Sequence, residues 1–521
     1  MVKMKRWLYG LLGTVLLLSG CSVEMETQGR NTGPYPLDTE VELTHWLELN
    51  DDVRFSTEKF GDTPFAKQLE EETGVHVKYI TPVNGNGTDA LNLMIASREL
   101  PDLISYPWYH YPGGAERALA EQLIQPLTDL IARYSPNLNT YLEEHPEIKK
   151  MVTTDQGEYT MYPFIRGDES LTVYFGPMVR RDWLEATGRR TLETVDDWYG
   201  FLTDMKNRGV EKPLILTEPG IESGFLTGAF GVIPDSYVEN GKVVFGPVQP
   251  GYRRFLQTLR QWYAEGLIDK GLFSNVAMNN QNMLDGSGAA TIGYAGSTMG
   301  TLLKGLQEQD PEADLVGVPN PVLEHGQIPK FIRKDFLATP ANCVSITTQC
   351  KYPEIAARYL DYGYSREGMN LYNYGIEGES YTMQDGQPVY TDLILNNSDG
   401  LTSSQALALY TQTYSGPFIQ EKRYADMYYS YPQQREAVET WARSDVDQYQ
   451  LPIISIGEDE YEEYSRIYTA VTNHSDKSLV EFVMGVRPIE EFDQYVREIR
   501  DLGLERMLEI QQAAYERYQK K

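Results

Sequence analysis

Tyrosine is unusually frequent in this sequence, with 37 of 521 residues. The tyrosines gather in three segments, residues 106–111, 359–374 and 424–431. Aromatic rings can cover the apolar C–H faces of a sugar, while phenol and carboxylate oxygens bond the hydroxyl groups at its rim. Such rings could therefore contact a sugar, although a single aromatic residue more often packs in a core.

Eight residues are candidates for contact with a ligand because of where they fall on the expected elements. They are Trp46, Glu48, Trp108, Tyr109, Tyr174, Tyr294, Tyr374 and Glu377. The first two end the first expected strand, the next two follow the third strand, and Tyr174 lies beside an expected hinge. Tyr294 precedes a Gly-rich helix start. Gly375 and Gly378 around the last pair also suit a helix cap, which would leave Glu377 merely solvated.

Motifs for catalysis and for metal binding are absent from the sequence. It has no Gly-x-Ser-x-Gly elbow, no phosphate loop and no His-Glu-x-x-His spacing among its six histidines. The acidic run at 458–463 suits the start of a helix, where carboxylates interact well with the helix dipole. We expect no metal and no cofactor. Because the chain has 75 acidic residues, the sequence does not exclude a pair of catalytic carboxylates.

The elements that must position these residues form two α/β units. Residues 41–46 and 75–80 alternate as strands, and residues 65–73 between them have helical spacing, so the chain opens as a βαβ unit. A second unit spans residues 180–334, where an apolar strand at 290–294 meets a helix at 299–308. Ligand-facing loops are expected at the carboxyl ends of such strands. Apolar residues recur at three and four from Glu490 to Tyr518, which predicts two docked helices separated at Gly503.

The amino terminus has the layout of a secretory signal. Basic residues precede an apolar run from Leu8 to Leu18, which is shorter than the roughly 20 residues that cross a bilayer. The tetrapeptide Leu18-Ser19-Gly20-Cys21 resembles a lipobox, so residues 1–20 are predicted to be removed and Cys21 to carry fatty acyl chains such as palmitate. The polar residues that follow, 21–40, are expected to be a flexible tether.

The formal net charge is −29, and a surface of this sign repels nucleic acid and anionic lipid headgroups.

Besides Cys21, the chain has Cys343 and Cys350. Their spacing allows either a disulfide or two reduced, partly buried thiols, because sequence alone does not supply the Cα separation that a bridge requires.

Several segments resemble the large bacterial extracellular solute-binding lipoproteins of carbohydrate ABC importers. This is the LipO-like branch of the group that includes maltose-binding and alginate-oligosaccharide-binding proteins. The segments are Met94–Asp102, Arg181–Leu184, Asn373–Gly378, Phe492–Val496 and Leu502–Leu504. The resemblance runs from the lipobox to the last helix and rests on the order and spacing of these segments together.

The resemblance implies a two-lobed, periplasmic-binding-protein-like α/β fold, with discontinuous lobes joined by hinge crossings. The pattern restarts near residues 170, 336 and 389, so the N-terminal lobe is expected at 41–170 plus 336–390 and the C-terminal lobe at 171–335 plus 391–521. It further implies a monomeric, non-enzymatic receptor that presents an oligosaccharide to an ABC permease. The receptor would be held by lipid on the outer face of the cytoplasmic membrane of a Gram-positive-like cell. An oligopeptide receptor of the same fold and a surface polysaccharide-degrading lipoprotein stay open as alternatives.

One departure from the resemblance concerns calcium. Relatives that bind acidic oligosaccharides often carry an acidic calcium loop after the helix that follows the Asp-Trp-Leu motif. Here the corresponding stretch, Lys206–Pro213, is short and basic. Calcium takes six to eight oxygen ligands, so we predict no calcium site of the family type.

Overall fold

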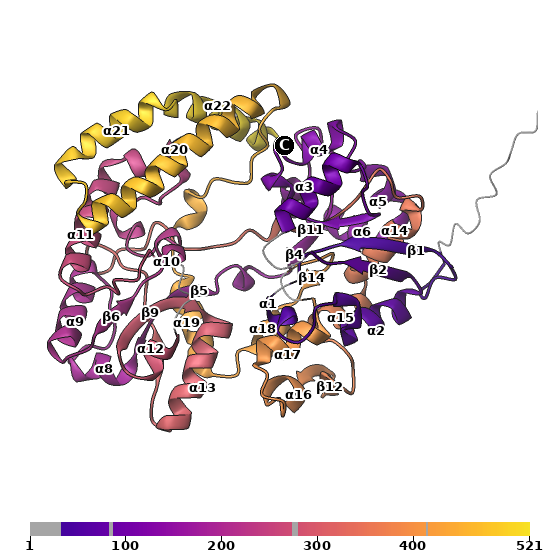
Figure 1. Ribbon diagram of the computed structural model, residues 1–521. Coiled ribbons are helices and arrows are strands. Elements are labelled where there is room, and N and C mark those ends of the chain that lie inside the picture. The colour runs from indigo at the N-terminus through magenta and orange to yellow at the C-terminus, as the bar shows by residue number, and fades with distance from the viewer. Residues whose placement is uncertain (1–32, 50, 83–86, 274–279, 413–414) are drawn as a thin grey trace, which may run out of the picture.

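The computed structural model describes residues 33–49, 51–82, 87–273, 280–412 and 415–521. Figure 1 shows two lobes with extended chain segments passing between them. Each lobe has its own mixed β-sheet with helices packed around it, so the predicted two-lobed α/β fold is confirmed.

The N-terminal lobe is built on a sheet that has six strands within the described residues, in the order β14-β4-β11-β3-β1-β2. Strand β1 pairs in parallel with β2 and β3, while β11 runs antiparallel to β3 and β4. The strands are β1 (Glu42–Trp46), β2 (His76–Ile80), β3 (Leu103–Ser105), β4 (Tyr162–Arg166), β11 (Ala338–Ile346) and β14 (Ile419–Gln420).

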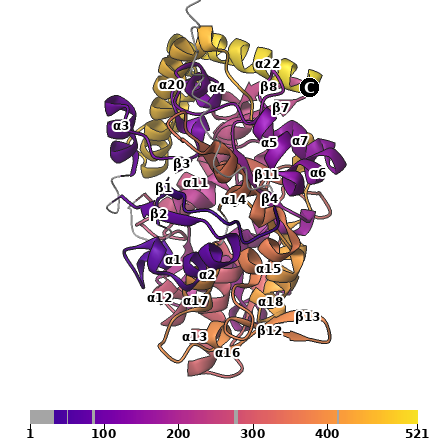
Figure 2. The same ribbon diagram turned by 90° about the vertical axis from the view of Figure 1, so that its right-hand side faces the viewer.

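Helices surround this sheet, and a hairpin of β12 (Tyr381–Gln384) and β13 (Gln387–Tyr390) extends from the lobe. The helices are α1 (Asp51–Arg54), α2 (Pro64–Thr73), α3 (Gly87–Ser97), α4 (Gly114–Ala120), α5 (Thr128–Tyr134), α6 (Pro136–Glu144), α7 (Pro146–Val152), α14 (Pro353–Asp361), α15 (Arg366–Tyr374), α16 (Asp392–Leu395) and α17 (Ser403–Tyr410). Figure 2 shows α17 beside α1 and α2.

The C-terminal lobe has a sheet of four described strands in the order β10-β5-β9-β6. These are β5 (Phe175–Arg180), β6 (Lys212–Ile215), β9 (Gly288–Tyr294) and β10 (Leu315–Gly317), and a hairpin of β7 (Ser236–Glu239) and β8 (Lys242–Phe245) lies apart from them. Its helices are α8 (Arg181–Ala186), α9 (Val195–Asn207), α10 (Glu218–Glu222), α11 (Pro250–Ala264), α12 (Asn280–Leu284), α13 (Gly300–Gln309), α19 (Pro432–Trp441), α20 (Glu458–Met484), α21 (Phe492–Asp501) and α22 (Leu504–Lys520). The predicted pair of docked C-terminal helices is confirmed, with Gly503 between them at φ 106°.

Local sequence signals explain where these helices begin and end. The Thr63 side chain accepts a hydrogen bond from the Ala66 amide and Pro64 opens α2, while Gly74 ends it in the left-handed conformation. Helix α9 begins with a reciprocal capping box between Thr194 and Asp197. The acidic run predicted to start a helix forms the first turn of α20.

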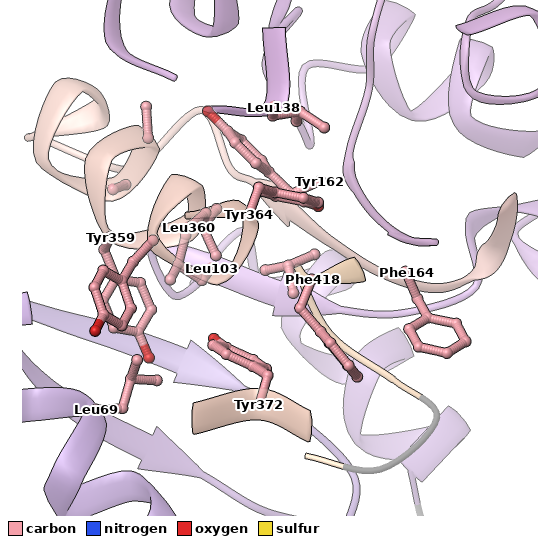
Figure 3. Close-up of a cluster of buried hydrophobic side chains, with 14 of the residues drawn as sticks. Leu69, Leu103, Leu138, Tyr162, Phe164, Tyr359, Leu360, Tyr364, Tyr372 and Phe418 are labelled. Carbon is pink, nitrogen blue, oxygen red and sulfur yellow. The ribbon is translucent and has the colours of Figure 1, made fainter. Parts of the chain in front are cut away.

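Much of the tyrosine content lies in the core of the N-terminal lobe, drawn in Figure 3. Tyr372 stacks on Phe418 with centroids 5.0 Å apart, and the Tyr364 hydroxyl donates to the Pro163 carbonyl at 2.6 Å. The Tyr359 hydroxyl lies 2.9 Å from the Tyr79 hydroxyl. The cluster at 359–374 is therefore a packing feature whose phenols find hydrogen-bond partners inside the lobe.

The described chain crosses between the lobes three times. The first crossing joins β4 to β5, the second joins β10 to β11, and the third leaves β14 through α18 (Lys422–Tyr428) for α19. The prediction that residues 391–521 belong to the C-terminal lobe is wrong for residues 391–420. Helix α17 packs on α1 and α2, and β14 adds to the N-terminal sheet beside β4.

The predicted tether at 21–40 also needs correction. Residues 1–20 and Cys21 lie outside the described residues, but residues 33–40 are docked on the N-terminal lobe. The Tyr35 hydroxyl donates to the Arg358 carbonyl at 2.6 Å, and its ring packs edge-on against Tyr362. Leu37 is buried, and a Cβ placed on Gly74 would lie 2.3 Å from the Leu37 carbonyl oxygen. The side chains of Tyr35 and Leu37 thus hold this mostly polar segment against the lobe.

Cys343 and Cys350 are both buried thiols that form no disulfide with each other, which decides between the two alternatives that the sequence left open. Burial raises the pKa of Cys350 to about 12, so its thiol stays protonated at neutral pH. No helix of the described chain is long and apolar enough to cross a membrane.

Candidate ligand-binding site

A cavity of about 580 Å³ lies between the two lobes. The N-terminal lobe contributes Tyr109, His110, the start of α4 and residues 151–154 to its lining. The C-terminal lobe contributes residues 453–456, one face of α20 and Lys521. A ligand in this cavity would touch both lobes at once, and its size suits a small organic molecule.

Three tyrosines of α20 line the cavity on one side. Tyr461, Tyr464 and Tyr468 are three and four residues apart, so they share one face of the helix. The rings of Tyr464 and Tyr468 stack with centroids 5.5 Å apart and planes inclined by 26°. Together they form a broad aromatic wall.

Hydrogen bonds hold this wall in place. Gln511 of α22 donates to the Tyr464 hydroxyl at 3.0 Å and accepts a hydrogen bond from the Ser236 hydroxyl at 2.9 Å. Burial raises the pKa of Tyr464 to about 12, with a further contribution from the charge of Asp235. The phenol therefore stays protonated and can donate to a ligand hydroxyl.

A second aromatic pair lies where the crossings meet. Tyr174, in the first crossing, stacks on Tyr294 at the end of β9, with centroids 6.0 Å apart and planes inclined by 15°. The Tyr174 hydroxyl donates to the Asp335 carboxylate in the second crossing. Arg166 at the end of β4 is only 3% exposed and forms an ion pair with Asp335 at 2.6 Å.

These contacts make Asp335 the link between the first two crossings. Burial raises the pKa of Tyr174, and the Asp335 carboxylate raises it further, so the phenol remains a donor. Burial and the Asp335 charge also raise the pKa of Tyr109. Tyr109, Tyr174 and Tyr294 are therefore predicted candidates that the structure brings to the interlobe region, and Tyr109 is 46% exposed.

The other predicted candidates lie elsewhere. Trp46 and Trp108 are 2% and 0% exposed, and both pack in an apolar cluster behind the cavity wall. Tyr374 is buried, and its hydroxyl donates to the Glu421 carboxylate at 2.5 Å. Glu377 is exposed on the loop before the β12–β13 hairpin, apart from the cavity residues. In this structure none of these four presents a surface to a ligand in the cavity.

Glu48 is exposed on the N-terminal lobe, and its carboxylate lies against the start of α3, where a Cβ on Gly87 would come within 1.5 Å of it. A carboxylate is well placed there, because the first amides of a helix have no partners within the helix. Its charge also contributes to the raised pKa of Tyr106, for which burial is the larger cause.

Sequence reasoning missed the aromatic face of α20. The segment stood out only for its acidic run, yet the spacing of Tyr461, Tyr464 and Tyr468 was a signal for an aromatic stripe. The roles of Arg166 and Asp335 had no sequence signal, because they lie 169 residues apart along the chain.

The described residues hold no group of three or more His, Cys, Asp or Glu side chains placed for a metal ion. Aromatic rings, hydroxyl groups and carboxylates are what the lobes offer to a ligand. Such groups bind and orient a polar molecule with apolar faces.

Two α/β lobes, crossings between them and an interlobe cavity define a solute-binding type of protein. The model of the bacterial extracellular solute-binding protein family matches residues 57–370, and the chain belongs to this family.

Two curated relatives are similar over most of their length. The fructooligosaccharide ABC transporter substrate-binding protein FusA of Streptococcus pneumoniae serotype 4 is 25% identical, with 97% of each chain covered. Lipoprotein LipO of Bacillus subtilis is 24% identical over 78% of this chain and 79% of LipO.

Solved structures share the fold. The alginate-binding protein AlgQ2 without calcium ion superposes with a TM-score of 0.77 at 23% identity, covering 93% of this chain and 100% of AlgQ2. FusA of S. pneumoniae in complex with kestose gives a TM-score of 0.73 at 22% identity, covering 92% and 99%.

Proposed function

We propose that this chain is the substrate-binding lipoprotein of an ABC importer, which captures an oligosaccharide between its lobes and delivers it to the permease. The observation that carries the proposal is the interlobe cavity, with stacked tyrosines on one lobe and Tyr109 on the other. Stacked rings suit the C–H faces of sugar units. FusA, which is named for fructooligosaccharides and was solved with kestose, supports this reading.

The proposed mechanism is binding without chemistry on the ligand. A sugar that touches both lobes favours the closed form by its differential affinity for that form. The permease then recognises the closed form of the protein. The two crossings that Asp335 connects are the proposed hinge for this closure, because they join the lobes while the core of each lobe stays intact. The protein acts as a monomeric receptor, without a metal or cofactor.

The proposal includes anchoring through Cys21 on the outer face of the cytoplasmic membrane of a Gram-positive-like cell. LipO, a lipoprotein by name, supports it. A Cys21→Ser variant should appear in the soluble fraction and still bind ligand. Membrane retention of the variant, or loss of ligand binding with release, would reject this part of the proposal.

The test of the ligand class is a thermal-shift screen of the protein without its signal sequence against oligosaccharides and short peptides. A ligand that binds the folded chain raises the melting temperature according to RT ln(1 + [L]/Kd). We expect shifts with one class of oligosaccharide and none with peptides. Chromatography of the incubated sugars checks for turnover. Shifts with peptides alone, or the appearance of shorter sugars, would overturn the proposal.

A further inference from the structure

A line of three polar side chains from three elements ends at the surface of the interlobe cavity. Ser236 is the first residue of β7, Gln511 lies in α22, and Tyr464 lies in α20, which runs beside α22 (Figure 1). The Ser236 hydroxyl donates to Gln511 Oε1 at 2.9 Å, and Gln511 Nε2 donates to the Tyr464 hydroxyl oxygen at 3.0 Å. Tyr464 in turn lines the cavity. Hydrogen bonds thus connect the interior of the C-terminal lobe to the aromatic wall.

Burial determines which end of the Gln511 amide faces Ser236. Gln511 is 3% exposed and Ser236 is 7% exposed, and among the described residues the Ser236 hydroxyl has no other hydrogen-bond acceptor. If the amide were reversed, its NH2 group would donate to the Ser236 oxygen, and the buried Ser236 proton would have no acceptor. A buried donor without an acceptor costs free energy. The orientation with the amide oxygen towards Ser236 is therefore the more stable one.

This orientation decides where the Tyr464 proton lies. A phenol oxygen that accepts a hydrogen bond from Gln511 does not donate its own proton to the same group. Gln511 occupies the side of the phenol oxygen that faces the lobe interior, so the proton is left to the side that faces the cavity. Burial raises the pKa of Tyr464 to about 12, so the proton is present at neutral pH.

The neighbouring ring offers a contrast. Tyr468 stacks on Tyr464 and lines the same cavity, but within the described part of the chain its hydroxyl has no hydrogen-bond partner. It is free to rotate, so it can donate to a ligand or accept from it. The wall therefore combines one hydroxyl with a fixed direction and one that adapts.

We propose that Gln511 is a positioning residue that directs the Tyr464 hydroxyl proton into the cavity, where this proton binds an acceptor oxygen of the sugar. The acceptor is a ring, glycosidic or hydroxyl oxygen. This inference rests on the proposed function and names the ligand atom that one cavity residue recognises. Hydrogen bonds in a line polarise one another, so the bond from Ser236 to Gln511 also strengthens the donor at Tyr464.

The direction of the hydrogen bond can be measured without any sugar. 3-Fluorotyrosine placed at position 464 of the Cys21→Ser chain gives one 19F signal, which follows the ionisation of that phenol. A hydrogen bond donated to the phenol oxygen stabilises the ionised form and lowers the pKa. Gln511→Met removes this donor at similar volume, so it should raise the pKa at position 464 by about half a unit or more.

Ser236 provides an independent test, because it does not touch Tyr464 itself. Ser236→Ala removes the donor that orients the amide, so Gln511 can turn its oxygen to the Tyr464 hydroxyl, stabilise the neutral phenol and raise its pKa. Ser236→Thr keeps the hydroxyl and should keep the wild-type pKa. A lowered pKa in Gln511→Met, or an unchanged pKa in Ser236→Ala, overturns the inference.

The sugar arm measures the affinity for the sugar found by screening, by calorimetry. Gln511→Met should weaken binding about fivefold, the effect of one hydrogen bond. In the Tyr464→Phe background the same change should cost nothing more, because no hydroxyl is left to direct. The matched control is Gln519→Met, which breaks a hydrogen bond from Gln519 to Tyr515 on the same helix. Tyr515 lies outside the cavity lining, so this variant should bind as the wild type does.

The possible outcomes separate the positioning role from the proposed function. Equal losses from Gln511→Met with and without the Tyr464 hydroxyl would show that Gln511 acts through packing alone, and would overturn the inference while the sugar receptor stands. If no sugar binds to the wild type, the proposed function fails and the sugar acceptor named here fails with it. The 19F measurement then still decides whether the Tyr464 proton faces the cavity.

Discussion

At the scale of single residues, the cleft depends on aromatic rings that are exposed on one face and fixed on the other. Tyr464 and Tyr468 meet this requirement, because the stack and the Gln511 hydrogen bond hold them before any ligand arrives. A side chain that is already ordered loses little conformational entropy on binding. Such residues can therefore contribute strongly to affinity.

We expect Tyr468→Ala to weaken binding of the sugar found by screening about tenfold or more, because it removes one ring of the stacked Tyr464 and Tyr468 pair. Loss of a buried aromatic contact at the centre of a binding site typically costs over 1 kcal/mol. Isothermal titration calorimetry measures the effect. Tyr352→Ala is the control, since Tyr352 is an exposed tyrosine of the N-terminal lobe outside the cavity lining. Equal affinities of the two variants would remove Tyr468 from the site.

Trp108 and Tyr109 are neighbours in sequence with opposite roles. Trp108 is 0% exposed, so Trp108→Ala should cost about 3–5 kcal/mol of stability through the cavity that it leaves. Tyr109→Ala should change stability little and weaken binding. Urea unfolding and calorimetry on both variants separate the two effects. A stable Trp108→Ala protein with weakened binding would contradict this assignment.

His45 gives the stability of the N-terminal lobe a pH dependence. Its imidazole is buried beside Ser105 at 2.8 Å, and burial lowers its pKa from 6.5 to about 3. Between these two values the unfolded chain binds a proton that the folded chain does not. The free energy of unfolding therefore falls as the pH drops below 6.5, by about 1.4 kcal/mol per pH unit from this one group.

We expect His45→Gln to flatten this dependence between pH 6.5 and 4.5, measured by urea unfolding at three pH values. Identical slopes for the wild type and His45→Gln would show that His45 is not the responsible group.

From the sequence, the presence of aromatic residues between the lobes was easier to predict than the identity of those residues. Tyr109, Tyr174 and Tyr294 lie in the interlobe region, as expected for loops that follow strands or lie at hinges. Trp46 and Trp108 met the same positional test but point into the core, since the direction of a ring depends on packing partners distant in sequence. Cys343, for example, packs in the same cluster as both tryptophans.

At the scale of elements, the crossings are connected by a buried charge. Arg166 ends β4, and its only ion pair among the described residues is with Asp335. The Asp335 amide also donates to the Thr172 carbonyl at 2.9 Å, so side chain and backbone both connect the two crossings. These contacts keep the first two crossings close together.

Asp335→Asn should destabilise the protein by about 3–5 kcal/mol, because it leaves the Arg166 guanidinium buried without a counter-charge. The double variant Arg166→Met, Asp335→Asn should lose less, since it removes the buried charge as well. Thermal and urea unfolding of both variants provide the comparison. A double variant less stable than the single one would show that the pair itself, and not the unpaired charge, dominates.

Element order was predictable from periodicity, whereas the third crossing was not. Strand β14 has only Ile419 and Gln420, too short for any alternation to appear, and it joins the sheet through pairing with Ile165 and Arg166. The docking of Tyr35 and Leu37 depends on partners near residues 358 and 74. Contacts over such separations leave no trace in a local pattern.

At the scale of the whole molecule, the C-terminal end of α22 lies next to the N-terminal lobe (Figure 1), and Lys521 after it lines the cavity. Arg517 pairs with Asp155 of the N-terminal lobe at 2.8 Å, and Lys521 donates to the Thr153 carbonyl at 2.7 Å. The Lys150 ammonium lies 4.8 Å from the centre of the Tyr518 ring. These contacts exist only while the lobes are close at this edge, so they favour that arrangement over a more open one.

We expect Asp155→Asn to shift the ligand-free protein towards larger interlobe distances and to weaken ligand binding about fivefold. A partly exposed ion pair contributes roughly 1 kcal/mol, which corresponds to that factor. Spin labels on exposed positions of the two lobes measure the distance distribution. Arg517→Gln should act in the same way, and the double variant should add little, because both substitutions break one contact. Lys520→Gln removes a charge from the exposed side of the same helix and should change neither quantity. If the distance distribution of Asp155→Asn matches that of the wild type, α22 does not hold the lobes together, and the hinge at Asp335 alone determines how far they open.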